Sequence, residues 1–186
     1  MILENKVIGI VFINNFIIKD SLKFELLKLK SQNNITLIPI MNFNNLNNNI
    51  EIISKITKNE PLFYNKDIIL EKNIKSLDIL ILIGCSYDLI CKLAINKFNN
   101  NVLKIIKNCK IGNKTIVLGI DIKNFNFSSF NVIDKLYNKN GYYFIPFKIN
   151  NPITKPDNLS FDSSLLTKTI SLATEKIQIK PLLSFL

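Results

Sequence analysis

The sequence predicts an α/β fold: a single three-layer domain over residues 1–186, built on a doubly wound, mostly parallel sheet. Short apolar runs alternate along the chain with segments whose apolar residues recur at helical spacing, as in repeated strand–helix–strand units. The runs carry few charges, as expected of parallel strands that are covered on both faces. The overall balance, 47% apolar and 20% charged residues, is that of a globular protein.

The first quarter of the chain predicts two strands, each followed by a helix. Residues 7–13 form an apolar run without the small-residue cleavage site of a signal peptide, so we interpret it as a strand. Apolar residues at helical spacing then predict a helix over 18–29, with lysines near its end as the helix dipole favours. A second strand is expected over 35–40. The Asn-rich segment 42–49 predicts a loop before a helix over 50–57.

The middle of the chain contains the strongest strand signal. A short strand is expected over 68–70, and residues 77–83 form an apolar run whose only charge is Asp78. Helical spacing then predicts two helices, over 89–98 and 102–109. Residues 115–120 form another buried strand.

The last third of the chain predicts a helix, a strand and a final helix. Apolar spacing indicates a helix over 132–137, a last strand over 142–147, and a C-terminal helix over 166–173, with Pro181 stopping any extension. One Asn-Pro pair and one Lys-Pro pair make 150–158 a polar loop. Three roles are open for this loop: a lid, a subunit contact or a surface turn.

Composition excludes several reaction classes. The chain has no histidine, which excludes a Ser-His-Asp triad, a Cys-His pair and imidazole metal ligands. Its three cysteines, Cys85, Cys91 and Cys109, have no metal-ligand spacing, and an odd number suits a reducing compartment. No apolar run approaches the roughly 18 residues that cross a bilayer, so we expect a cytoplasmic protein.

The net charge of +10 raises the alternative of a basic nucleic-acid-binding module. All of the positive residues are lysines, however, and arginine is the residue best suited to phosphate and guanine recognition. The lysines are also scattered along the chain, and the abundance of Lys, Asn, Ile, Phe and Tyr is typical of AT-rich coding sequence. A solvated lysine surface is therefore the favoured interpretation.

Candidate ligand-binding residues follow the predicted strands. Ligands of doubly wound sheets bind beyond the carboxyl ends of the strands, where the strand order reverses. Segments 13–17, 84–88 and 121–125 are expected there. The candidate residues in or near these segments are Asn14, Asn15, Ser86, Asp88, Lys92 and Asp121.

Each candidate has a structural alternative. Ser86 precedes a predicted helix, where it serves as a phosphate ligand or as a plain N-cap. Asp88 opposes an anion in the same loop, at a cost on the order of 3 kcal/mol for a charge about 5 Å away. Cys85 is a candidate thiolate near a helix N-terminus, although no histidine is available as its base. Residues 13–15 lack the glycines of a dinucleotide fingerprint, so this chain alone is not expected to bind a nicotinamide cofactor.

Several short stretches in the second half of the chain form a specific set. They are Ile116–Ile120, Tyr143–Phe147, Asn151-Pro152, Lys155-Pro156, Leu165-Leu166 with Thr169, and Gln178 with Pro181. With this spacing, most of residues 77–183, together with Ile8-Gly9, resemble the family formed by the B subunit of dipicolinate synthase. That family is part of a flavoprotein-like group that also contains flavin-containing cysteine decarboxylases.

The resemblance implies a flavoprotein-like fold and a role in making dipicolinate. The implied reaction is NAD(P)-dependent oxidation of dihydrodipicolinate, a pyridine dicarboxylate, in the mother cell of a sporulating bacterium. It also implies a partner, the dehydrogenase (A) subunit of dipicolinate synthase, which would carry the NAD(P). The present chain would then be the non-dehydrogenase subunit.

The sequence departs from the family at the two loops expected to face a ligand. The family has Thr-Gly-Ser where this chain has Ile13-Asn14-Asn15, and Pro-x-Thr-Gly-Asn where it has Gly84–Asp88. Of the family's polar residues in and after the second loop, this chain keeps only a hydroxyl, at Ser86, and the later lysine, Lys92. The departures favour an accessory subunit over the alternative, an FMN-binding oxidoreductase or decarboxylase.

Overall fold

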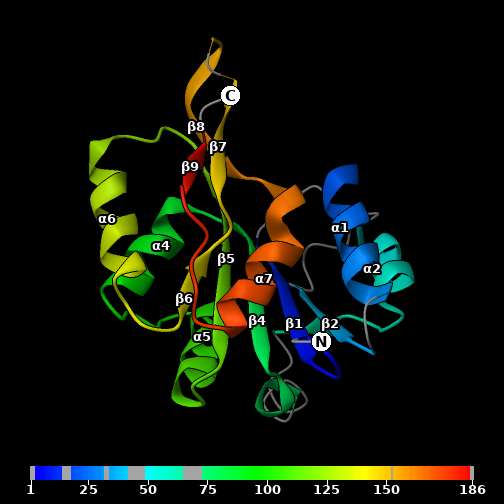
Figure 1. The fold of residues 1–186 in the computed structure, drawn as a ribbon. Coiled ribbons are helices and arrows are strands. Elements are labelled where there is room, and N and C mark those ends of the chain that lie inside the picture. The colour runs from blue at the N-terminus through cyan, green and yellow to red at the C-terminus, as the bar shows by residue number, and fades with distance from the viewer. Residues whose placement is uncertain are drawn as a thin grey trace.

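A parallel sheet forms the middle layer of the protein (Figure 1). The computed structural model describes residues 3–13, 18–31, 34–41, 49–64, 73–151 and 153–184. Six parallel strands lie in the order β3-β2-β1-β4-β5-β6, so that the order reverses between β1 and β4. Their bounds are β1 (Val7–Phe12), β2 (Thr36–Met41), β3 (Leu62–Phe63), β4 (Ile79–Cys85), β5 (Thr115–Ile122) and β6 (Tyr142–Phe144).

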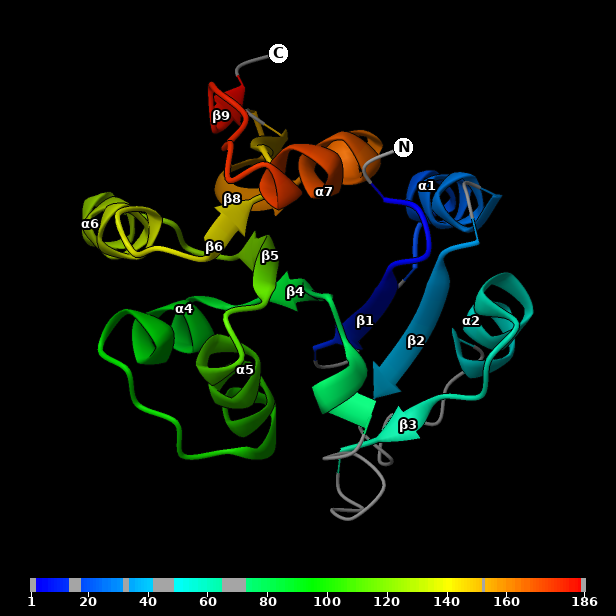
Figure 2. The ribbon, with the colours of Figure 1, turned by 60° about the horizontal axis from the view of Figure 1, so that its bottom comes forward.

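Helices cover both faces of this sheet (Figure 2). On one face lie α1 (Asp20–Ser31), α2 (Asn49–Thr57) and α7 (Leu166–Thr174), with the 3₁₀ turn η1 (Ser163–Leu165) leading into α7. On the other lie α4 (Tyr87–Ala94), α5 (Asn101–Ile111) and α6 (Phe127–Tyr137). The apolar side chains form two clusters, one on each face of the sheet. The three-layer, mostly parallel α/β fold predicted from the sequence is confirmed.

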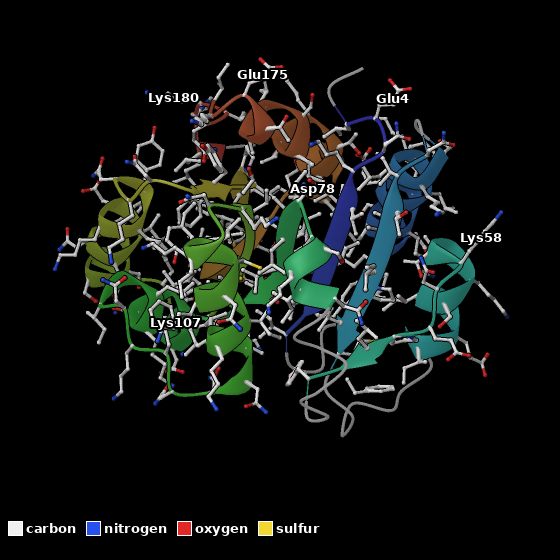
Figure 3. The ribbon with its side chains drawn as sticks, turned by 90° about the horizontal axis from the view of Figure 1, so that it is seen from below. Glu4, Lys58, Asp78, Lys107, Glu175 and Lys180 are labelled. Carbon is white, nitrogen blue, oxygen red and sulfur yellow. The ribbon has the colours of Figure 1, made fainter. Side chains whose placement is uncertain are left out.

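The central strands are apolar because both of their faces are covered. All seven residues of β4 are buried, as are five of the six residues of β1. Asp78 lies just before β4 rather than within it, and its Oδ2 accepts a hydrogen bond from the Val7 N–H at 2.9 Å. Figure 3 shows Asp78 from the amino edge of the sheet, where it ties β4 to the start of β1.

The strand predicted over 142–147 is two strands, because Pro146 interrupts it. β6 ends at Phe144, and β7 (Phe147–Asn151) begins after the proline, which has no N–H to donate. At the open edge of β6, the Gln178 side chain takes the place of a neighbouring strand. Its Oε1 accepts from the Phe144 N–H at 2.7 Å, and its Nε2 donates to the Phe144 carbonyl at 2.8 Å.

The predicted loop 150–158 is wrong for most of its length. β8 (Lys155–Phe161) pairs antiparallel with both β7 and the end of β5, and β9 (Leu183–Ser184) runs parallel to β7. Figure 1 shows β7 and β8 projecting beyond the carboxyl edge of the main sheet. The strand expected over 68–70 and nearly all of the loop expected over 42–49 lie outside the described residues. Within the described ranges, no helix combines the length and apolarity needed to cross a membrane.

Candidate functional site

A pocket of about 380 Å³ lies at the carboxyl edge of the sheet, at the point where the strand order reverses. Segments far apart in the sequence form it: the end of β1, the turn after β3, and the first residues of α4 and α5. The lining residues are Ile13, Tyr64, Ser86, Asp88, Leu89, Asn100, Asn101 and Val102. Ile13 is held by its N–H, which donates to the Ile83 carbonyl at 2.9 Å.

The loop after β4 turns sharply into α4. Gly84 has a φ of +83°, a conformation that favours glycine, and the pairing of β4 with β5 shifts register between Ile83 and Cys85. Ser86 then has extended backbone, and its Oγ accepts a hydrogen bond from the Leu89 N–H at 3.4 Å. Ser86 is thus both the N-cap of α4 and a lining residue of the pocket, so its two expected roles are compatible.

A second helix begins at the same pocket, outside the segments that the sequence predicted to face a ligand. Asn100 is the N-cap of α5, and its Oδ1 accepts from the Leu103 N–H at 2.8 Å. The signal was present, because an asparagine directly before apolar residues at helical spacing is a typical N-cap. Two helix N-termini, each equivalent to roughly half a positive charge, therefore face one pocket.

The negative charge of Asp88 is paired within its own helix. Lys92 Nζ lies 2.6 Å from Asp88 Oδ2, one helical turn away, and the Asp88 side chain is 71% exposed. The pairing reduces the repulsion that Asp88 exerts on an anion in the pocket. Lys92 itself does not line the pocket.

Of the remaining candidates, Asp121 does not line this pocket. β5 continues through Asp121 to Ile122, because β8 pairs with it and places Asp121 opposite Ser160. Alternation along the strand sets Asp121 on the face opposite Ile120 and Ile122, which pack toward α4, α5 and α6. Asn14 and Asn15 lie outside the described residues, directly after the lining residue Ile13.

The structure excludes the idea of a reactive thiolate at Cys85. Its side chain is buried, with Sγ 3.7 Å from the Leu82 carbonyl oxygen, and burial raises the pKa of the thiol above its ordinary value. A protonated, enclosed thiol is neither a nucleophile nor a metal ligand. Cys85 is a core residue.

Comparison with solved structures matches the whole fold. The crystal structure of the B subunit of dipicolinate synthase from Bacillus halodurans aligns with a TM-score of 0.79 and 22% sequence identity, over 100% of this chain and 99% of that one. The present chain has the fold of that protein. The β7–β8 arm beyond the main sheet is included in the alignment.

Two decarboxylases share the fold at lower similarity. The FMN-dependent cysteine decarboxylase SpaF aligns with a TM-score of 0.66 and 11% identity, over 95% of this chain and 98% of that one. Peptidyl-cysteine decarboxylase EpiD aligns with a TM-score of 0.63 and 14% identity, over 90% and 98%. No protein-family model matches the sequence, and a search of curated proteins finds no match. The likeness thus establishes a flavoprotein-like fold.

Proposed function

We propose that this chain is the non-dehydrogenase subunit of a two-subunit dipicolinate synthase, acting in the sporulation of its bacterium. The observation that carries the proposal is the end-to-end likeness to the B subunit of dipicolinate synthase, in which practically all of both chains align. The sequence supports it, because residues 13–15 lack the glycines that a dinucleotide needs. The NAD(P) would therefore be bound by the partner, the dehydrogenase subunit.

The carboxyl-edge pocket suits a pyridine dicarboxylate. Its volume of about 380 Å³ accommodates a single ring, and two helix N-termini favour the two carboxylates of such a ligand. Ser86 adds a hydroxyl, and Asn101 adds an amide beside it. Lys92, just outside the lining, pairs with Asp88 and offsets part of the negative charge that Asp88 brings to the pocket. In the complex, this pocket would contribute to the binding of dihydrodipicolinate while the NAD(P) of the dehydrogenase partner accepts the hydride.

Co-expression with a cognate dehydrogenase subunit tests the assembly and the activity together. We expect the two chains to co-elute, and we expect dihydrodipicolinate-dependent formation of NAD(P)H to rise when this chain is present. If the chains elute separately and the rate is unchanged, the proposal is wrong.

A charge variant tests the pocket itself. Asn101→Asp adds a negative charge to the lining, but it lies in the first turn of α5, where an acid is favourable for the helix. We expect an intact complex with a higher KM for dihydrodipicolinate. Asn131→Asp makes the same change at an exposed position on α6 and should leave the KM unchanged.

The second candidate function is an FMN-binding oxidoreductase or decarboxylase. It is favoured by the convergence of two helix N-termini and the Ser86 hydroxyl, a donor set that fits the phosphate of FMN. In that case Ser86 and the first N–H groups of α4 and α5 would hold the phosphate, and the flavin would supply redox chemistry. A colourless protein that takes up no added flavin, judged by its visible absorbance after gel filtration, excludes this candidate.

A further inference from the structure

A larger cavity, of about 800 Å³, lies at the opposite, amino edge of the sheet. It is bounded by the first residues of β5 and β6 and by the ends of α5, α6 and α7. The lining includes Thr115 and Ile116 of β5, and Gly141 to Tyr143 at the start of β6. It shares no lining residue with the carboxyl-edge pocket, and the proposed function makes no use of it.

The cavity is strongly positive. Four lysines line it, Lys110, Lys114, Lys139 and Lys176, and the lining residues in the described part of the chain include no carboxylate. Lysines near helix C-termini commonly balance the helix dipole. The ends of α5, α6 and α7 lie here, and Lys139 also donates to the last carbonyls of α4. At about half a negative charge each, these four helix ends offset about half of what the four lysines carry. A positive excess of about two charges remains.

The lysines also crowd one another. Lys139 Nζ donates to the Ala94 carbonyl at 2.6 Å and to Asn96 Oδ1 at 3.2 Å, which holds it at the end of α4. Burial, and secondarily the positive charge of Lys110, lower the pKa of Lys139. Lys110 Nζ in turn lies 5.2 Å from the centroid of the Tyr142 ring. The charges of Lys110 and Lys139 thus act on one another, and the lining residues that the structure describes include no carboxylate to offset them.

Tyr142 forms part of the wall of the cavity. The residue lines the cavity and is only 3% exposed, and its hydroxyl has no hydrogen-bond partner among the described residues. The hydroxyl oxygen is itself enclosed, so it lies behind the wall of the cavity rather than open to it. Burial raises the pKa of this hydroxyl to about 12, so it stays protonated.

We propose that the amino-edge cavity is a second binding site, for a small oxyanion that carries several phosphate or carboxylate charges. Lys110, Lys114 and Lys176 would neutralise the anion, next to the wall that Tyr142 forms. The volume lies within the range of small-molecule sites.

Calorimetric titration of the full chain at physiological salt tests this site, with inorganic pyrophosphate and citrate as probes. We expect saturable binding of at least one probe: pyrophosphate alone indicates a phosphate ligand, and citrate alone a carboxylate ligand. The double variant Lys114→Gln with Lys176→Gln should weaken the binding more than about tenfold, since hydrogen bonds to charged groups are lost. The matched control, Lys104→Gln with Lys107→Gln, removes the same charge from exposed positions on α5. Figure 3 labels Lys107.

A second control is Tyr142→Phe, which keeps the ring and its packing but removes the enclosed hydroxyl. We expect unchanged binding and an unchanged fold. The proposal is overturned if neither probe binds saturably, or if the two double variants weaken the binding equally, since diffuse surface charge would then explain it.

Discussion

Gly9, in the middle of β1, has no room for a side chain. A Cβ at this position would lie 2.7 Å from Leu77 Cδ1 and 3.4 Å from Ile40 Cδ1, and both of these neighbours are buried. We expect Gly9→Ala to lower the free energy of unfolding by about 1–3 kcal/mol, the usual cost of overpacking a core. Urea denaturation measures it.

Gly112→Ala is the control for that substitution. There the contact, at 3.2 Å, is with the end of the Lys114 side chain, which is free to move. Equal losses at positions 9 and 112 would mean that a general cost of replacing glycine, rather than crowding around β1, sets the loss.

Asp162 gives a prediction about acid stability. Its partial burial raises the pKa, but hydrogen bonds from the Ser164 hydroxyl and N–H, together with the nearby Lys148, outweigh that effect and lower the pKa below 3.8. The carboxylate therefore stabilises the fold above pH 3.8, and this contribution is lost as the pH falls through the depressed pKa. We expect wild type to be more stable than Asp162→Asn at neutral pH, with the difference shrinking in acid. Urea denaturation across a pH series measures it, and a constant difference would contradict the expectation.

At the scale of elements, a buried carboxylate joins α1 to α7. Glu25 is 4% exposed, and its Oε2 accepts from the Thr167 hydroxyl at 2.6 Å and from the Thr167 N–H at 3.3 Å. Thr167→Val keeps the shape but removes one donor from a buried charge. We expect a loss of about 1–3 kcal/mol in the free energy of unfolding. Thr174→Val should lower the free energy of unfolding much less, because the Thr174 hydroxyl donates to the Ser171 carbonyl within its own helix.

The sequence predicted the elements of the parallel sheet better than those of the arm beside it. Apolar runs and helical spacing are local signals, and they located β1, β2, β4 and β5 within about two residues. The β7–β8 hairpin was missed because its strands contain Asn150 and Pro156, which locally indicate a loop. Its pairing with the end of β5 is a tertiary contact that no local pattern reveals.

The same reasoning explains which part of the candidate site was found. Ser86 could be identified because a strand and a helix lie on either side of it. Asn100 and Tyr64 join the pocket only through the folding of distant segments, so spacing along the chain could not place them beside Ser86. Asp121 was expected at the same edge because β5 was predicted to end at Ile120, two residues too early.

At the scale of the whole molecule, the direction of the strands separates two kinds of surface. Helices α4 and α5 begin at the carboxyl edge, where their positive ends face the pocket of Ser86 and Asn100. Helices α5, α6 and α7 end at the amino edge, where the charge of the lysines exceeds that of the negative ends. Both edges of the sheet therefore favour anions, for different reasons. At the carboxyl edge the cause is the dipoles of the helix backbones, and at the amino edge it is the charge of the lysine side chains.

The sheet also divides the apolar interior into two clusters, one on each of its faces. Ile170 on α7 and Ile106 on α5 are both fully buried, but on opposite faces of the sheet. We expect Ile170→Val and Ile106→Val each to cost about 0.5–1.5 kcal/mol, and the double variant to lose their sum within about 0.5 kcal/mol. A double-mutant cycle on Glu25 and Thr167, which hydrogen-bond to each other, should instead deviate from additivity. The cost of a substitution on one side would then not depend on which residue occupies the other side, so the two halves of the interior can vary in sequence without matched changes across the sheet.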